Sequence, residues 1–444
     1  MEQNFNEELV NPNKNQGKFF GVFFANMFTL SLMFVSGILV MRTLGPAESG
    51  RFISIYVIPG LLIRFALLGT RQSTIFHLGK NKFNESKVVS ALIYLWLFSS
   101  IMALIINSIN YHFLHRFHLS FQLHLLVLSA IPMRLFIVYC IGIFFGKRKF
   151  FFSNLFTFLP EFINFLVILY LILFHNINVH DAIMAYFISS LLVSVLCLVV
   201  LKRMVSFNLE YNWAVIKAVA VLGLLNATAL FIMQLNYKID LLFMYKYTTH
   251  YEVGIYALGV GIAAIIWQIP DTIGLLVQSA VSNTKDYLIL KHGISSVLRV
   301  AMAFAVVISI LIYFGSPFLI KLVYGKAFLP SVYIVRAILP GVFTFVIYRT
   351  ISGVFSGLGK PQILIAIFIP ALVLNILLNI FLIPMYHGIG AAWASNISYT
   401  AGAIATLVVF SRKMNLSLVE VFHYKVSDFK FLKRYVPFRR YKKN

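Results

Sequence analysis

Residues 151–174 read FFSNLFTFLPEFINFLVILYLILF, an apolar stretch with one acidic residue, Glu161, and no basic residue. About 20 consecutive apolar residues are enough to cross the hydrocarbon core of a bilayer as an α-helix. Similar stretches bounded by charged residues lie at 19–41, 52–77, 88–109, 122–145, 151–174, 182–201, 218–245, 253–281, 297–315, 332–358, 361–383 and 390–410. The sequence therefore predicts an all-α polytopic membrane protein with about 12 transmembrane helices.

The overall composition excludes a water-soluble globular protein. Hydrophobic residues make up 60% of the 444-residue chain and charged residues 11%, and the mean hydropathy is +0.87. A net charge of +23 would indicate nucleic acid in a soluble protein, but 44 Phe and 22 Tyr suit lipid-facing surfaces and interfacial belts. No nucleic-acid partner is predicted.

The loop cations are distributed unequally between the two sides of the membrane. Both chain ends and the loops on their side carry 25 Lys and Arg, whereas the opposite loops carry Arg42, Arg51, Arg116, Lys246, Lys321 and Lys326. By the positive-inside rule, both termini of this multi-pass protein are expected in the cytoplasm and the chain in the cell (inner) membrane.

Several punctuating residues recur at an offset of about 204 to 211 residues. The pairs are Glu48-x-Gly50-x-Phe52 with Glu252-x-Gly254-x-Tyr256, Pro59 with Pro270, Pro132 with Pro340, and Pro160 with Pro370. Because each half has an even number of crossings, the halves run in the same direction. We expect two six-helix bundles related by a parallel internal repeat, at 1–201 and 218–410, joined by a cytoplasmic linker at 202–217 and followed by a basic cytoplasmic tail at 411–444.

Short motifs in a characteristic order carry a resemblance to a known family. They are Leu44-Gly45-Pro46; Asp240 followed by Glu252-Val253-Gly254-Ile255-Tyr256-Ala257; Leu322-Val323-Tyr324-Gly325; Gly357-Leu358-Gly359-Lys360-Pro361; Asn375-x-x-x-Asn379; and Gly388-Ile389-Gly390-Ala391-Ala392. Over nearly the whole chain the sequence resembles the O-antigen and polysaccharide flippases of the multidrug/oligosaccharidyl-lipid/polysaccharide exporter superfamily. The resemblance implies a transporter, not an enzyme, that moves a prenyl-diphosphate-linked oligosaccharide to the outer leaflet. It also implies a monomer surrounded by membrane lipids, with the polysaccharide polymerase and glycosyltransferases of the same pathway as further partners.

Six cations lie inside the predicted crossings and are the candidate substrate-binding residues. They are Arg64, Arg71, Arg134, Lys238, Arg336 and Arg349. Ionised groups are costly at a helix centre, so they are expected to face the protein interior, where Arg binds phosphate oxygens well. Arg64 and Arg71 are two turns apart and share a face, whereas Arg336 and Arg349 are about 220° apart and line one cavity only if Pro340 alters the phase.

Three acids lie at comparable depth and are the candidate ion-coupling residues: Asp240, Glu161 and Asp271. Glu161 and Asp271 each follow a proline directly, where a bent helix exposes carbonyl ligands. Each acid is either a ligand for a coupling proton or sodium ion or a counter-ion to one of the arginines.

The sequence contains no motif that predicts a disulfide, a metal site, nucleotide binding or catalysis. Cys140 and Cys197 lie in separate apolar runs, which predicts neither a disulfide nor a metal site, and no Gly-rich phosphate loop or catalytic residue set occurs. No cofactor is expected beyond a coupling H+ or Na+. The alternatives are a membrane glycosyltransferase or polysaccharide polymerase, for which the outward loops are short, a multidrug exporter of the same fold, and a membrane scaffold.

Overall fold

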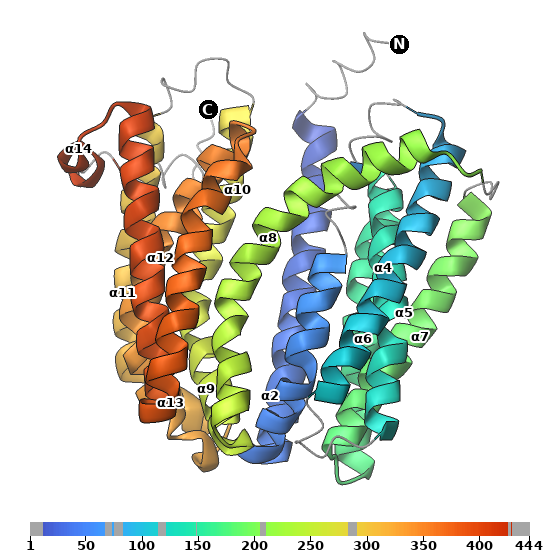
Figure 1. Ribbon diagram of the computed structural model, residues 1–444, viewed down its shortest axis with the longest axis horizontal. Helices are drawn as coiled ribbons and strands as arrows, with labels where there is room; N and C mark the ends of the chain where they lie inside the picture. The colour runs from blue at the N-terminus through green and yellow to red at the C-terminus, as the bar shows by residue number, and fades with distance from the viewer. Residues whose placement is uncertain are drawn as a thin grey trace, which may run out of the picture. The chain divides into compact units, whose positions relative to one another are not determined.

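The computed structural model describes residues 12–66, 73–74, 83–113, 121–147, 149–204, 210–282, 291–424 and 428 (Figure 1). The regular secondary structure in these ranges is helical, which confirms the all-α class. The α-helices are α2 (Pro12–Ala66), α4 (Glu85–Phe113), α5 (Phe121–Gly146), α6 (Phe150–Phe174), α7 (Val179–Met204), α8 (Trp213–Tyr247), α9 (His250–Ala263), α10 (Gln268–Ser282), α11 (Lys291–Val323), α12 (Ser331–Gly357), α13 (Pro361–Met414) and α14 (Leu418–Phe422).

α13 contains two predicted crossings, and α2 contains the first predicted crossing and the part of the second up to Ala66. α2 turns at Gly45, whose φ of 72° lies in the left-handed region that glycine adopts readily, and α13 turns at His387. Within the described residues, nine spans are long and apolar enough to cross a membrane, and the spans in α2 and α13 each contain one of these turns. α8 covers the seventh predicted crossing, and α9 with α10 covers the eighth. The chain is a multi-pass membrane protein with about 12 helices.

The chain divides into two compact units, Met1–Phe231 and Ile232–Asn444, so α8 begins in the first and ends in the second. α7 continues to Met204 and α8 begins at Trp213, inside the segment expected to be a linker. The two predicted bundles, their repeat and the linker stay predictions. Most of the predicted basic tail lies outside the described residues.

In the first unit, α2 packs against α6, and α5 packs against α4, α6 and α7. Buried side chains such as Leu92, Phe144 and Cys197 form a core that extends to Val219 of α8. At one end of this core Lys147 Nζ lies 2.5 Å from Glu85 Oε1 and donates to the Met204 carbonyl at 2.8 Å. These contacts hold the ends of α4, α5 and α7 together.

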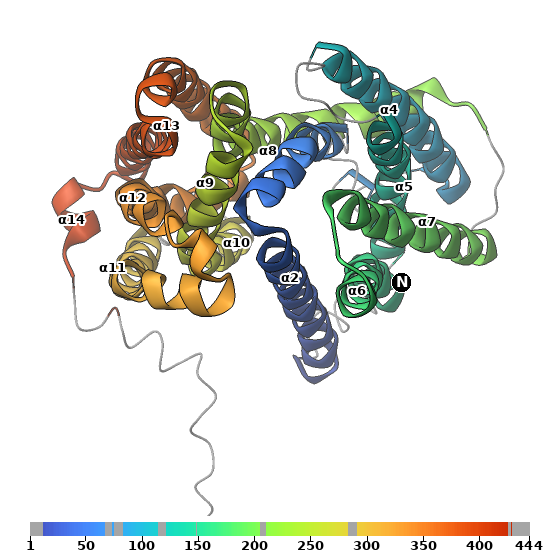
Figure 2. The same ribbon diagram turned by 90° about the horizontal axis from the view of Figure 1, so that it is seen from below.

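In the second unit, α12 is the central helix and contacts α9, α10, α11 and α13 (Figure 2). Pro340 lacks an N–H donor for the helical ladder, and Asn396 of α13 bridges the donor and acceptor of the next bond, from residue 341 to residue 337. The Gly341 amide donates to Asn396 Oδ1 at 2.8 Å, and Asn396 Nδ2 donates to the Ala337 carbonyl at 2.7 Å. A side chain that bridges the interrupted ladder satisfies backbone groups that lipid could not.

Candidate functional site

The structure brings together Arg134 and Glu161, two of the residues singled out in the sequence. Arg134 lies on α5 and Glu161 on α6, directly after Pro160. Arg134 Nη1 lies 2.9 Å from Glu161 Oε1, and the two side chains are 12% and 19% exposed. In this structure Glu161 is the counter-ion of Arg134, one of the two roles open to it.

Residues of α7 form the other contacts of the Arg134 guanidinium, which are two hydrogen bonds and a cation–π contact. Nε donates to Ser190 Oγ at 2.8 Å and Nη2 to Ser189 Oγ at 3.4 Å, while the Tyr186 ring lies against the guanidinium with its centre 4.1 Å from Cζ. An arginine has five N–H donors. Glu161 and the two serines engage three of them, so among the described residues two donors remain for an anion.

A second buried arginine forms an ion pair in the other unit. Arg349 of α12 pairs with Asp271 of α10, and their side chains are 10% and 47% exposed. The guanidinium carbon also lies 4.1 Å from the ring centre of Trp267 and 5.0 Å from that of Tyr237. Such cation–π contacts stabilise a charge in a site with little water. Asp271, like Glu161, follows a proline and neutralises an arginine of a neighbouring helix.

Close backbone packing sets the position of this second pair. α10 and α12 approach at Gly274, Gly353 and Gly357, and a Cβ atom at Gly274 would lie 2.6 Å from the Arg349 carbonyl oxygen. Small residues permit this kind of approach between membrane helices. Glycine at these positions therefore allows α10 and α12 to approach closely next to the Asp271–Arg349 pair.

We therefore expect Gly353→Ala to lower stability, by about 1 to 3 kcal/mol, because the new methyl group collides with the backbone of α10. Gly315→Ala in α11 is the matched control, since nothing lies within 4 Å of its Cβ position. It should leave stability unchanged or raise it slightly, as alanine favours helix. Thermal unfolding in detergent compares the two, and equal melting temperatures would contradict the packing explanation.

Asp240 of α8 is completely buried within the second unit. Tyr256 Oη donates to its Oδ2, Ser395 Oγ donates to the same oxygen at 3.4 Å, and the Leu241 amide donates to Oδ1 at 2.8 Å. Among the described residues, all of its hydrogen-bond partners are neutral. Asp240 thus differs from Glu161 and Asp271, which are both paired with arginine.

Asn236 lies one turn before Asp240 on the same face of α8 and forms a cluster of buried amides with Asn375 and Asn379 of α13. Asn375 Nδ2 donates to the Asn236 carbonyl at 3.1 Å, Asn379 Nδ2 donates to Asn375 Oδ1 at 2.9 Å, and Ser398 Oγ donates to Asn236 Oδ1 at 3.4 Å. Asn379 Oδ1 has no hydrogen-bond partner among the described residues. Carboxylate, amide and hydroxyl oxygens are the ligands that hard cations prefer.

Arg336 lies apart from these clusters in the part of the chain that the structure describes. Arg336 donates from Nε to the Tyr313 carbonyl of α11 at 3.3 Å and stacks on the Tyr313 ring, so Arg336 and Arg349 have different neighbours on α12. Lys238 is exposed on α8. The Arg64 side chain and all of Arg71 lie outside the described residues.

From the sequence alone, no role could be assigned to most of the uncharged residues that contact Arg134, Arg349 and Asp240. Tyr186, Tyr237, Trp267 and Ser395 look like ordinary residues of apolar helices. Tyr256 and the Asn375-x-x-x-Asn379 pair did stand out, but as parts of family motifs and not as neighbours of Asp240 or Asn236.

Comparison with known proteins identifies the fold. The sequence matches no protein-family model and no curated relative. The structure resembles the lipid II flippase MurJ in an inward closed conformation, with a TM-score of 0.71 and 18% identity over 94% of this chain and 93% of that chain. It also resembles an inward-facing multidrug resistance MATE family transporter, with a TM-score of 0.69 and 14% identity over 87% of this chain and 94% of that one.

A third similar structure is a MOP superfamily transporter from Pyrococcus furiosus, for which a binding pocket of reverse polarity suggests a different function. Its TM-score is 0.62 at 16% identity, over 88% of this chain and 94% of that chain. These proteins transport different compounds, and the low identities show the fold alone. The chain is an all-helical, multi-pass membrane protein whose fold is similar to that of these MurJ, MATE and MOP transporter structures.

Proposed function

We propose that this chain is a flippase that moves a prenyl-diphosphate-linked oligosaccharide, an O-antigen or other surface polysaccharide unit, from the cytoplasmic to the outer leaflet by alternating access. The observation that carries the proposal is Arg134, a guanidinium buried among membrane-spanning helices with two N–H donors left for an anion. Arg forms charge-assisted bonds with phosphate oxygens that strengthen in a water-poor site. One similar structure is itself a lipid flippase.

The balance of intramembrane charge also favours an anionic substrate. Glu161 and Asp271 neutralise Arg134 and Arg349. In the sequence, the six candidate cations and three candidate acids of the predicted crossings leave an excess of three positive charges. An exporter of cationic drugs would favour the opposite sign. Multidrug export is the alternative that the other similar structures raise.

We further propose that flipping is coupled to an ion gradient, with Asp240 as the residue that carries the ion and Glu161 as the second candidate for this role. Asp240 is a buried carboxylate that accepts its hydrogen bonds from neutral groups, so binding a proton or Na+ changes the charge at this position. The unpartnered Asn379 Oδ1 is a further oxygen in the neighbouring cluster of buried amides. An ion that binds one conformation better than the other biases the two-state equilibrium.

In the membrane, we expect the chain to act as a monomer, with the polysaccharide polymerase and glycosyltransferases of the same pathway as partners. Binding of the carrier headgroup tests the proposed site in the purified protein. A prenyl diphosphate should bind the wild type more tightly than the matching prenyl alcohol, and Arg134→Gln should remove this difference. Lys321→Gln, at an exposed helix end, is the control and should preserve it. Equal binding of both lipids by the wild type, or preferential binding of a cationic amphiphile, would contradict an anionic substrate.

The excess of loop cations on one side predicts that both termini lie in the cytoplasm. Cys140 and Cys197 are buried, so a variant without them allows a single cysteine to be placed at Asn444. In intact cells this cysteine should resist an impermeant thiol reagent and should react after the membrane is permeabilised. Reaction in intact cells would show the opposite orientation, and a cysteine at Tyr251, in the loop expected outside, provides the positive control.

A further inference from the structure

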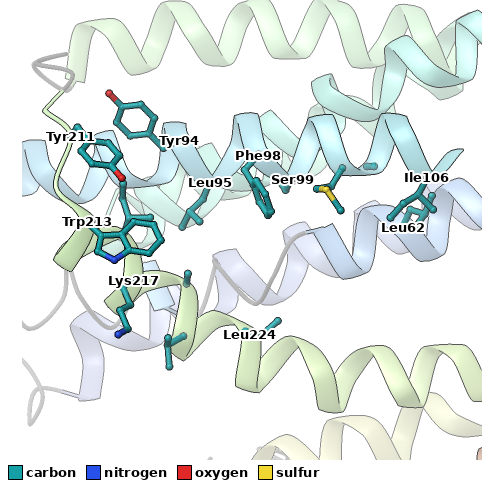
Figure 3. Close-up of a pocket in the computed structure, with 15 residues that line it drawn as sticks. Leu62, Tyr94, Leu95, Phe98, Ser99, Ile106, Tyr211, Trp213, Lys217 and Leu224 are labelled. Carbon is teal, nitrogen blue, oxygen red and sulfur yellow. The ribbon is translucent and has the colours of Figure 1, made fainter. Parts of the chain in front are cut away.

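The first unit contains an apolar cavity that is separate from the clusters around Arg134 and Asp240. It has a volume of about 650 Å³ and lies between α2, α4 and the first part of α8 (Figure 3). Its walls include Leu95, Phe98 and Met102 of α4 and Ile216 and Leu224 of α8. The volume falls within the range of about 300 to 1,000 Å³ that is usual for ligand pockets.

The middle of this cavity presents almost no polar surface. Ser99 is a polar residue in this part of the lining. Its hydroxyl donates to the Trp96 carbonyl at 3.1 Å and lies 3.3 Å from Tyr139 Oη. The hydroxyl is therefore engaged inside the bundle. The occupant of this part must be a hydrocarbon, because a polar group here would lose its hydration without gaining a partner.

The polar groups of the lining gather at one end. Figure 3 shows Tyr94, Tyr211 and Trp213 near Lys217 at this end, while Leu62 and Ile106 lie at the other. Tyr211 and Trp213 are 68% and 63% exposed. Exposed Tyr and Trp beside a lysine are typical of the level of lipid headgroups at a membrane surface.

Further positive charge lies on the same side of the first unit. α7 ends in Lys202 and Arg203, and Leu201 of that last turn packs in the same core cluster as Ile216 of the cavity wall. Polybasic segments next to membrane helices attract anionic lipids. The cavity therefore combines an apolar body with an aromatic, cationic mouth.

We propose that this cavity binds one acyl chain of an anionic phospholipid, with the headgroup phosphate held at Lys217 on the side of Trp213 away from Tyr211. The charge at the mouth selects an anionic headgroup, and the lining selects a hydrocarbon chain. A phospholipid of the surrounding leaflet fits better than the transported lipid, because the diphosphate of the latter is proposed to reach Arg134 inside the bundle. The bound lipid would support the first turns of α8 against α4.

Quenching of tryptophan fluorescence by lipids with brominated acyl chains measures this binding directly, since Trp213 lies at the mouth. Trp213→Phe identifies the part of the signal that this residue supplies. In the wild type, brominated phosphatidylglycerol should associate roughly fivefold more strongly than brominated phosphatidylcholine with the same chains, the effect expected of one cation at a membrane surface. Lys217→Gln should abolish this preference, and Lys360→Gln, an exposed cation of another loop, should not.

Filling the cavity provides an independent test. Ala220→Phe, in the cavity wall, should abolish saturable quenching by both lipids, and Ala214→Phe, exposed on the same helix outside the cavity, should leave it unchanged. Equal quenching by both lipids in the wild type, or saturable quenching that survives Ala220→Phe in a folded protein, would overturn the proposal. So would an unlabelled polyprenyl phosphate that competes at lower concentration than phosphatidylglycerol, because the cavity would then belong to the transported lipid. None of these results depends on flipping activity.

Discussion

Replacing Asp240 by asparagine should abolish the response of transport to an ion gradient while the protein stays folded. The exchange keeps the size of the side chain and its hydrogen bonds with Tyr256 and Ser395 but removes the group that binds a proton or a sodium ion. If one proton is coupled, a difference of one pH unit should change the equilibrium distribution of substrate about tenfold in the wild type. In Asp240→Asn the equilibrium distribution of substrate should not change with the pH gradient.

Two further variants separate ion coupling from a structural effect at this site. Asp181→Asn, near the start of α7, removes an acid of the first unit that lies far along the chain from the proposed carrier and should leave coupling intact. Tyr256→Phe removes one hydrogen bond to Asp240 but keeps the carboxylate, so it should shift the pH dependence of transport without abolishing it. Gradient-dependent transport by Asp240→Asn would assign the coupling to another residue, with Glu161 the first to test.

Removing Arg134 should have the largest effect on stability. A buried charge that loses its partner costs about 3 to 5 kcal/mol, so Arg134→Gln and Glu161→Gln should each be strongly destabilising. The double variant leaves no unpaired charge and should recover much of the loss. Asp271→Asn should cost less than Glu161→Gln, because the Asp271 side chain is 47% exposed and the Glu161 side chain 19%.

The double variant also separates the binding role of Arg134 from its structural role. If the guanidinium holds the diphosphate, Arg134→Gln with Glu161→Gln should be stable but inactive in flipping, whereas Glu161→Gln should retain substrate binding once it is folded. Denaturation in detergent and binding of a prenyl diphosphate provide the two measurements. Normal flipping by the stable double variant would exclude Arg134 from the substrate site.

The helices were predictable because lipid imposes a simple rule on the chain. Each crossing needs a long apolar stretch, and runs such as 151–174 meet that need without any tertiary information. The turns inside α2 and α13 fall between predicted crossings, so the sequence located them to within a few residues. The parallel repeat stays a prediction, since matched prolines show recurrence and not superposition.

The pairing of charges was only partly predictable. Depth in the membrane singled out Arg134, Arg349, Glu161 and Asp271, but which acid meets which arginine depends on contacts between helices. The α10 and α12 approach at Gly274 and Gly353, which places Asp271 beside Arg349, has no local signature.

The angular position of residues around a single helix could be predicted from their spacing in the sequence. Arg336 and Arg349 are separated by about 220° on an ideal helix, and they contact Tyr313 and Trp267 respectively. Asn375 and Asn379 are one turn apart and form a hydrogen bond of 2.9 Å. The cavity beside Lys217 was not predictable, because it is formed by α2, α4 and α8 together.

Flipping in reconstituted vesicles tests the central claim most directly. Purified protein would be placed in proteoliposomes with a fluorescent prenyl-diphosphate-linked oligosaccharide, with imposed pH, sodium or voltage gradients, and the labelled lipid in each leaflet would be measured. We predict that the wild type moves this lipid, that a gradient biases its distribution, and that Asp240→Asn loses the bias while the Arg134, Glu161 double variant loses movement. Transport of a cationic amphiphile in place of the lipid, or no movement of the lipid under any gradient, would contradict the account.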